Sequence, residues 1–380
     1  KSNINVFNLL TSCASKTLSN YYAPYDADVI SAIKREDGII IGMTNMDEFA
    51  CGSSGETSFY GATGNPAAEG KIPGGSSSGS AAAVSAGFCD LALGADTGGS
   101  IRNPASHCGI VGIKPSYGRV SRYGLIDLAM SLEQIGPMTN SVYESALLLE
   151  IISGKSERDT TTHKEKVPYY EKEIQNTPKN LTLGLSKDFE KLCTDKKIYE
   201  SIVNATEKLA REYGWKIKNV KLEHVDLAIQ AYYPIAYVEF FSSTRKFDGR
   251  RFGYRIEETC GPEVLRRILG GAEISKAELR GRYYVRALIA RAAIKNDFEK
   301  AFKEVDCIVS PVTPKLPHKI GTGIDTKTMY AYDAYTIPAN LAGVASGAMP
   351  TGKLSGVPVG IQFTVNSFRE DLLLQVMHAY

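Results

Sequence analysis

Residues 71–102 read KIPGGSSSGSAAAVSAGFCDLALGADTGGSIR and contain six serines and seven glycines. This run is too rich in alanine for a flexible linker and too rich in glycine for an ordinary hydrophobic core. It divides into two motifs, PGGSSSGSAAA (73–83) and GADTGGSIR (94–102), in which Ser76 and Ser100 each follow a Gly-Gly pair. The first motif leads into a predicted short helix of small residues, and the second follows a predicted strand.

Three familiar short motifs overlap this run, and each lacks part of its required context. Residues 75–79 match G-x-S-x-G, but Lys71-Ile72-Pro73 is a poor strand to precede a nucleophile elbow. Residues 96–98 read Asp-Thr-Gly, yet the chain has no second such loop to complete an aspartic protease site. A phosphate loop would need Lys-Ser/Thr after Gly79. Glycine content alone leaves open a purely structural crossover in which backbones pack closely.

Beyond this run, strand and helix patterns alternate along the chain. Residues 24–45 predict a helix followed by a strand at Ile39-Ile40-Ile41, and residues 140–154 predict a capped amphipathic helix. Residues 155–180 are polar and aperiodic, and they predict an excursion over the surface. The alternation predicts an α/β fold whose sheet is covered by helices on both faces.

The overall composition is that of an ordinary globular chain. Of the 380 residues, 43% are hydrophobic and 23% charged, and 44 basic residues nearly balance 42 acidic ones. Nothing in this balance calls for a nucleic-acid or membrane partner, and no apolar run is long enough to span a bilayer. Seven cysteines without a CxxC pair favour a reducing compartment over a zinc ribbon or a disulfide framework. The start at Lys1 reads as a chain entered partway through.

The two serine motifs are followed by NPASHCGIVGIKP (103–115), and the chain begins Lys-Ser-Asn. Together these segments resemble the amidase-signature family, and the resemblance covers essentially the whole chain. It implies one large α/β domain over residues 1–380 with a mixed central sheet. Within it we expect a catalytic core at 1–154, an inserted helical part with the substrate pocket at 155–345, and a returning strand and helix at 346–380.

The resemblance also implies a Ser–cis-Ser–Lys mechanism. Ser100 would be the nucleophile, Ser76 the bridging serine in a cis peptide, and Lys1 the base. A serine hydroxyl needs a base to take its proton, and a lysine is a base only when burial keeps it neutral. The backbone N–H groups of Thr97, Gly98 and Gly99 would form the oxyanion hole, which explains why the loop carries so many glycines.

Within the family, the finer resemblance is to the A subunits of glutamyl-tRNA(Gln) amidotransferases. It rests on segments such as GMTNMDEFACGSSGETSFYGATGNP (42–66), YGRVSRYGLIDLAMSLEQIGPMT (117–139) and MYAYDAYTIPANLAGV (329–344). This resemblance implies hydrolysis of glutamine and delivery of the ammonia to a partner. The alternatives are a stand-alone amidase acting on another amide and a non-enzymatic scaffold.

A glutamine substrate carries an α-ammonium and an α-carboxylate, which call for one fixed acid and one fixed base. By the same resemblance we expect Asp333 to bind the ammonium and Arg267, rather than its neighbour Arg266, to bind the carboxylate. Tyr232 is expected to line the pocket. His107 stands where the family usually has an aromatic residue, and we interpret it as a packed core histidine.

The resemblance further implies that this chain needs no cofactor of its own. ATP and Mg²⁺ would be used by a B subunit, which would also make most contacts with Glu-tRNA(Gln), and a small third subunit would complete a heterotrimer. The chain departs from the family pattern at Ser2, at Ser78 and in a short segment after Arg255. These departures suggest an organellar form in the mitochondrial matrix, with a bacterial cytoplasmic protein as the alternative.

Overall fold

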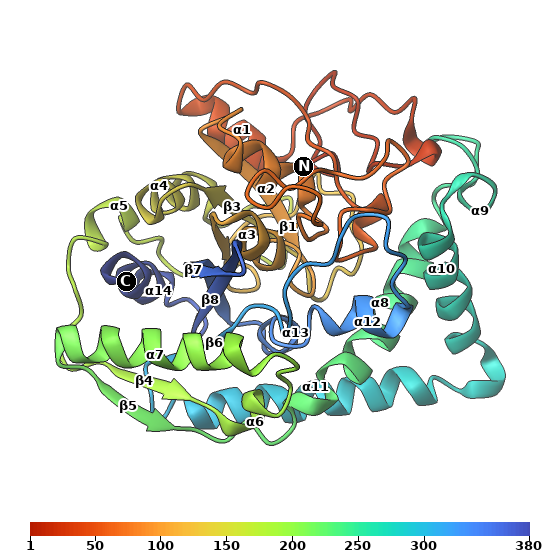
Figure 1. Ribbon diagram of the computed structural model, residues 1–380. Helices are drawn as coiled ribbons and strands as arrows, with labels where there is room; N and C mark the ends of the chain where they lie inside the picture. The colour runs from red at the N-terminus through yellow and green to blue at the C-terminus, as the bar shows by residue number, and fades with distance from the viewer.

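The computed structural model describes residues 1–380, whose centre is one eight-stranded sheet with the strand order β1-β3-β2-β7-β8-β6-β4-β5 (Figure 1). The α/β prediction is therefore confirmed. The strands are β1 (Leu91–Asp96), β2 (Val111–Lys114), β3 (Gln134–Thr139), β4 (Thr182–Leu185), β5 (Lys216–Asn219), β6 (Cys307–Pro311), β7 (Ala345–Leu354) and β8 (Val357–Val365).

The sheet is mixed, as the resemblance implied. The strands from β1 to β6 along this order pair antiparallel, whereas β6, β4 and β5 are parallel to one another. Strands β4 to β6, which come from the predicted inserted part, extend the same sheet that β1 to β3 begin. The predicted subdivision at residues 154 and 345 stays a prediction.

Helices cover both faces of the sheet (Figure 1). Helices α4, α7 and α14 pack on one face, while α2 and α3 pack on the other. The helices are α1 (Asp28–Arg35), α2 (Ser78–Ser85), α3 (Arg102–Cys108), α4 (Val142–Ile152), α5 (Tyr170–Glu173), α6 (Lys187–Glu190), α7 (Lys196–Tyr213), α8 (Ala228–Thr244), α9 (Ile256–Thr259), α10 (Pro262–Ile274), α11 (Arg282–Ala301), α12 (Thr326–Ala331), α13 (Ile337–Ala342) and α14 (Glu370–Ala379). None of them is long and apolar enough to cross a membrane.

Strand β8 shows how the two faces differ. Ile361 and Phe363 point into the core shared with α4, α7 and α14, as the two-residue period of a strand requires. The alternate residues Gln362 and Thr364 are also buried but face the side of α3. The second face of the sheet therefore supplies hydrogen-bonding groups between the sheet and the helices.

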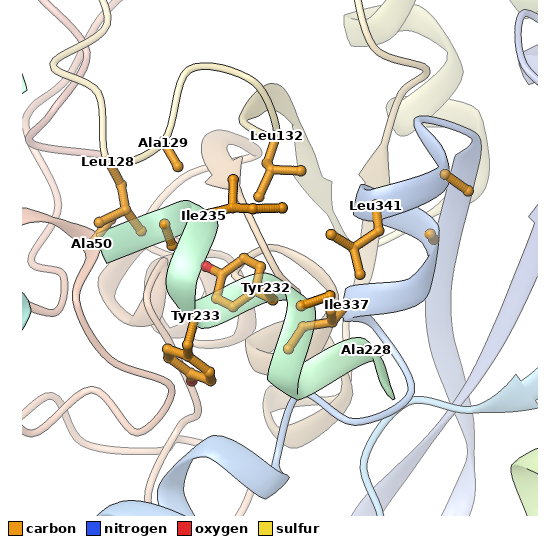
Figure 2. Packing of buried hydrophobic residues seen from close by; sticks show 14 of the residues in the cluster. Ala50, Leu128, Ala129, Leu132, Ala228, Tyr232, Tyr233, Ile235, Ile337 and Leu341 are labelled. Carbon is orange, nitrogen blue, oxygen red and sulfur yellow. The ribbon is translucent and has the colours of Figure 1, made fainter. Parts of the chain in front are cut away.

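A second apolar core lies among α8, α10, α11 and α13 and the loops at residues 46–51 and 128–132. Figure 2 shows Tyr232 of α8 between Leu132 of the second loop and Ile337 of α13. This packing holds the helical part of the chain against the polar face of the sheet.

Two local predictions have different outcomes. The capped helix at 140–154 is confirmed as α4, where Ser141 and Glu144 form a reciprocal capping box. The prediction of a strand at Ile39-Ile40-Ile41 is wrong. No neighbouring strand pairs with this segment, and Ile39 is 86% exposed. A strand needs such a partner for its backbone groups.

Candidate active site

The loop that follows β1 is fixed by a buried ion pair between Asp96 and Arg102. Arg102 donates to both carboxylate oxygens of Asp96, each at 3.0 Å, and neither side chain is exposed. Asp96 also accepts the backbone N–H groups of Gly99 and Ile101. Burial alone would raise the pKa of Asp96, but Arg102 and these donors lower it to about 2. Asp96 therefore stays ionised and holds the Gly-Gly-Ser segment in one conformation.

The remaining donors of Arg102 connect this loop to the rest of the fold. Arg102 donates to the Thr336 carbonyl at 3.0 Å, to Gln362 Oε1 at 2.8 Å and to Asn340 Oδ1 at 2.6 Å. These partners lie just before α13, within α13 and on β8. Ser100, which lies between β1 and α3, is thereby held against both the sheet and the C-terminal helices.

The second serine loop lies directly against the first. The Gly75–Ser76 peptide is cis, and the Ser77 N–H donates to the Ser100 carbonyl at 3.0 Å. Asp47 braces this loop from the other side, since its N–H donates to the Ser76 carbonyl at 3.1 Å. A Cβ at position 75 would lie only 1.9 Å from Asp47 Oδ2, so this position requires glycine. The structure thus brings together the two motifs that the sequence singled out.

Lys1 reaches this junction with its side-chain amine. Nζ lies 2.9 Å from Ser76 Oγ and donates to the Ala95 carbonyl at 3.0 Å, and the residue is only 7% exposed. Burial lowers the pKa of Lys1 to about 8, although the carboxylates of Glu133, Asp47 and Asp96 oppose that shift. A substantial fraction of neutral amine is therefore present near pH 8, as a lysine base requires.

The backbone donors of the glycine loop are not equivalent. The Gly99 N–H donates to Asp96 Oδ1 at 2.8 Å, so it is already engaged within the protein. The N–H groups of Thr97, Gly98 and Ser100 have no acceptor in the structure. The predicted role of Gly99 as an oxyanion donor therefore does not fit this geometry, and the Ser100 N–H is the free donor in its place.

Tyr232 lies against this loop. A Cβ at Gly98 would approach the Tyr232 ring within 2.9 Å, so the absence of a side chain at 98 lets the ring pack there. Tyr232 is 4% exposed. The predicted lining residue is thus next to the predicted oxyanion donors.

Arg267 on α10 is buried, whereas the side chain of its neighbour Arg266 is 47% exposed. Arg267 Nε donates to Glu263 Oε1 at 2.9 Å, and the guanidinium lies over the rings of Tyr233 and Tyr330. Its two terminal nitrogens have no acceptor in the protein. They are therefore free for a planar carboxylate, which matches the fork of an arginine.

Asp333 is the residue predicted to bind the α-ammonium of the substrate. It accepts the Ser53 hydroxyl and, at 3.2 Å, the Asn103 side-chain amide, and it is 7% exposed. Its Oδ1 would lie 3.1 Å from a Cβ at Gly99. Burial raises the pKa of Asp333 to about 7, and its hydrogen-bond donors are all neutral. The carboxylate therefore lacks a cation of its own, which makes it a fitting site for a ligand ammonium.

Sequence reasoning missed the residues that hold the predicted ones in place. Asp96 and Arg102 both belong to the second serine motif. The residues that Arg102 also binds lie far away in the sequence, between 336 and 362, and no sequence pattern connects them to the motif. Ser53 and Asn103 were likewise quoted without a role. His107 is buried against the ring of Tyr332, where burial lowers its pKa to about 3, in agreement with a packed histidine. No cluster of three or more potential metal-ligating side chains occurs.

Comparisons with known proteins identify similar sequences and structures. A family model described as Amidase matches residues 1–374. The chain is 55% identical over 380 residues to the A subunit of glutamyl-tRNA(Gln) amidotransferase from Methanocaldococcus jannaschii, covering all of this chain and 86% of that protein.

Solved structures that cover the whole chain include the following two. The crystal structure of the A subunit of glutamyl-tRNA(Gln) amidotransferase from Thermotoga maritima has a TM-score of 0.89 at 39% identity, with 81% of that chain covered. The peptide amidase of Stenotrophomonas maltophilia has a TM-score of 0.84 at 27% identity, with 80% of that chain covered.

Proposed function

Because the chain belongs to the amidase family, we propose that it is the glutamine-hydrolysing A subunit of a glutamyl-tRNA(Gln) amidotransferase. The observation that carries the proposal is a pair of buried, oppositely charged side chains, each of which keeps hydrogen-bonding capacity that the protein does not use. The terminal nitrogens of Arg267 and the carboxylate of Asp333 both lie near Tyr232, which packs on the glycine loop. An α-amino acid amide presents the two complementary charges.

The first chemical step would be acylation of Ser100. Ser76 gives its proton to Lys1 Nζ and takes the proton of Ser100 Oγ, which attacks the side-chain carbonyl of glutamine. The N–H groups of Thr97, Gly98 and Ser100 stabilise the oxyanion, at roughly 3 kcal/mol for each well-placed donor. The proton returns from Lys1 through Ser76 to the leaving nitrogen, and ammonia departs.

Water then releases glutamate from the acyl-enzyme by the same proton route. In this half of the reaction, Ser76 takes a proton from the attacking water and passes its own proton to Lys1. The proton then returns from Lys1 through Ser76 to Ser100 Oγ. Lys1, Ser76 and Ser100 therefore act in both halves of the reaction. Tyr232, Arg267 and Asp333 bind the amino acid without taking part in bond making.

The ammonia is then used outside this chain. We propose that Glu-tRNA(Gln) is amidated with ATP and Mg²⁺ by a B subunit, which makes most tRNA contacts and assembles with a small third subunit. The chain has no phosphate loop, and its net charge of +2 provides no basic track for RNA. The predicted mitochondrial location stays a prediction, and the relative from Methanocaldococcus jannaschii does not support it.

A stand-alone amidase is the second candidate. The fold and serine loops alone would serve it, since the peptide amidase of Stenotrophomonas maltophilia has a similar structure. It is not favoured, because an amidase for uncharged amides has no use for a buried guanidinium with open donors or for a buried carboxylate without an ion-pair partner.

The test is ammonia release from glutamine by the full-length chain, first alone and then in complex with its partner subunits and Glu-tRNA(Gln). We expect release that rises with the partners and falls by roughly 10⁴-fold or more in Ser100→Ala. A parallel assay uses propionamide, which lacks both α-groups. Glutamine inert in every mixture while propionamide is hydrolysed would establish the stand-alone amidase instead.

A further inference from the structure

One buried carboxyl next to Lys1 has no part in the mechanism described so far. Glu133 is fully buried just before β3, and its Oε2 accepts the Leu128 N–H at 2.7 Å. Its other oxygen, Oε1, is buried and has no hydrogen-bond partner. A buried carboxylate oxygen without a donor is costly, and such atoms therefore call for an explanation.

The strand register places Glu133 beside the loop that follows β1, where the site lies. Strands β1 and β3 pair antiparallel up to Asp96 opposite Gln134, so the next pair in the same register is Thr97 opposite Glu133. Cross-strand partners point to the same face of a sheet. Thr97 Oγ1 is also buried without a partner, and Lys1 Nζ binds the Ala95 carbonyl two residues earlier.

The other acidic groups that act on Lys1 are already engaged. Asp96 is held by Arg102, and Asp47 accepts hydrogen bonds from Gly55 and Thr57. Glu133 is the carboxylate among them that keeps an unpartnered oxygen. It also makes the largest opposing contribution to the lowered pKa of Lys1.

We infer that Glu133 is a positioning residue for the base, whose negative charge stabilises the Lys1 ammonium formed when the proton of Ser100 arrives through Ser76. The inference rests on the proposed roles of Lys1 and Ser100. No further bond is made or broken, since the proton goes from Ser100 to Ser76 and from Ser76 to Lys1. Burial raises the pKa of Glu133 to about 7, so its carboxylate is ionised near pH 8, where Lys1 acts as the base. A neutral side chain at 133 removes the largest of the favourable charges that act on Lys1 and leaves the ammonium only Asp47 and Asp96, which are already engaged.

Two opposing requirements explain why such a residue is useful. Burial keeps part of the Lys1 population neutral, which the base needs before the reaction, but it also disfavours the ammonium that the reaction creates. A buried carboxylate that acts on the amine offsets the second effect. The groups that act on this pair are Asp47, Asp96 and Cys13 around Lys1, and Asp127 and Arg122 around Glu133.

The experiment compares Glu133→Gln with the wild-type chain in its assembled complex. A glutamine at 133 keeps an oxygen for the Leu128 N–H but removes the charge. The readout is the rate at which a small fluorophosphonate labels Ser100 between pH 5.5 and 10. This rate depends on the neutral Lys1 and requires no glutamine. We expect the midpoint of the wild-type profile near pH 8, and in Glu133→Gln a midpoint lower by about one pH unit and a plateau rate about tenfold slower.

Glu239→Gln is the matched control. Glu239 on α8 holds the same loop by accepting the N–H and hydroxyl of Ser131, but it does not act on Lys1. We expect Glu239→Gln to leave the midpoint unchanged, and Glu133→Asp, which keeps the charge in a shorter side chain, to give an intermediate midpoint.

Two results would overturn the inference. One is an unchanged midpoint in Glu133→Gln, or in Glu133→Asp if only that variant folds. The other is an equal shift of the midpoint in Glu239→Gln. Failure of the proposed function would look different. Wild-type Ser100 would label with the expected profile, yet glutamine would release no ammonia.

Discussion

Asp96 and Asp333 are two buried carboxylates that approach the same glycine loop, yet their surroundings give them opposite properties. Asp96 has a guanidinium and several backbone donors, and its pKa is about 2. Asp333 has only the Ser53 hydroxyl and the Asn103 amide, and its pKa is about 7. Burial acts in the same direction on both, so the donors decide the difference.

The difference separates a structural carboxylate from a binding one. The charge of Asp96 is already paired with Arg102. The hydrogen bonds of Asp96 with Arg102 and the loop hold Ser100 in place. Asp333 has been desolvated without a direct ion-pair partner, although the charge of Arg267 lowers its pKa in part. A ligand ammonium would complete it, and the free energy gained would then contribute to substrate binding.

The largest effect is expected from removing the cation of the first carboxylate. Arg102→Met should leave Asp96 buried and unpaired, which typically destabilises a protein by about 3–5 kcal/mol. It also removes the bonds to Thr336, Asn340 and Gln362. We expect a lower midpoint of thermal unfolding and no measurable glutaminase activity. A variant with wild-type stability would show that the pair does not hold the loop.

Asp333→Asn should give the opposite pattern, with loss of binding but no loss of stability. The pKa of an aspartate in the unfolded chain is about 3.9, so the unfolded state releases this proton at lower pH than the folded state does. The carboxyl therefore costs stability as the pH rises from about 4 to about 7, and asparagine removes that cost. The KM for glutamine should rise about 100-fold, because a charged hydrogen bond is lost.

Propionamide provides the control for Asp333→Asn. It carries no α-ammonium, so its kcat/KM should be unchanged in the variant. An equal loss with propionamide and glutamine would mean that Asp333 supports the catalytic loop rather than the substrate, and the contrast with Asp96 would fail.

The sequence was informative where chemistry resides in consecutive residues. The serine motifs, with their Gly-Gly pairs, identified Ser76 and Ser100, and the structure places the two loops in direct contact. The β-α alternation predicted the α/β class, since each element buries its own periodic face. The choice of Arg267 over Arg266 came from the resemblance, and burial distinguishes the two in the structure.

What the sequence could not provide are the contacts made across long separations. The engagement of the Gly99 N–H by Asp96 depends on the conformation of the loop, and the roles of Ser53 and Glu133 depend on which elements become neighbours. The segment Ile39-Ile40-Ile41 has strand-forming residues, but a strand also needs a partner, which a local pattern does not reveal.

The pH dependence sharpens the contrast within one experiment. For glutamine, kcat/KM should rise with pH because both Asp333 and Lys1 must lose a proton, with pKa values of about 7 and about 8. Below pH 7 the rise should approach about 100-fold per unit, and between 7 and 8 about tenfold. In Asp333→Asn the steeper part should disappear. A profile with the same slope in both enzymes would show that Asp333 does not titrate in the free enzyme.

The smallest effect should come from a single neutral donor to Asp333. Ser53→Ala removes a hydrogen bond to the ionised carboxylate, so the pKa of Asp333 should rise further above its present value. At pH 7 a smaller fraction of the carboxylate would then be ionised, and the KM for glutamine should increase about fivefold, whereas at pH 9 it should stay within about twofold of wild type. Measuring KM at both values distinguishes this effect from simple loss of packing, which would raise KM equally at the two.

Ser85→Ala is the matched control for this last variant, since its hydroxyl binds the Cys108 carbonyl at the far end of α2 and should change neither value. Ser77→Ala would not serve, because the Ser77 hydroxyl bonds the backbone of Ala95, whose carbonyl also accepts Lys1 Nζ. If Ser53→Ala raised KM equally at pH 7 and pH 9, the neutral donors would fix only the orientation of Asp333, and the charge state of this carboxylate would be set by burial alone.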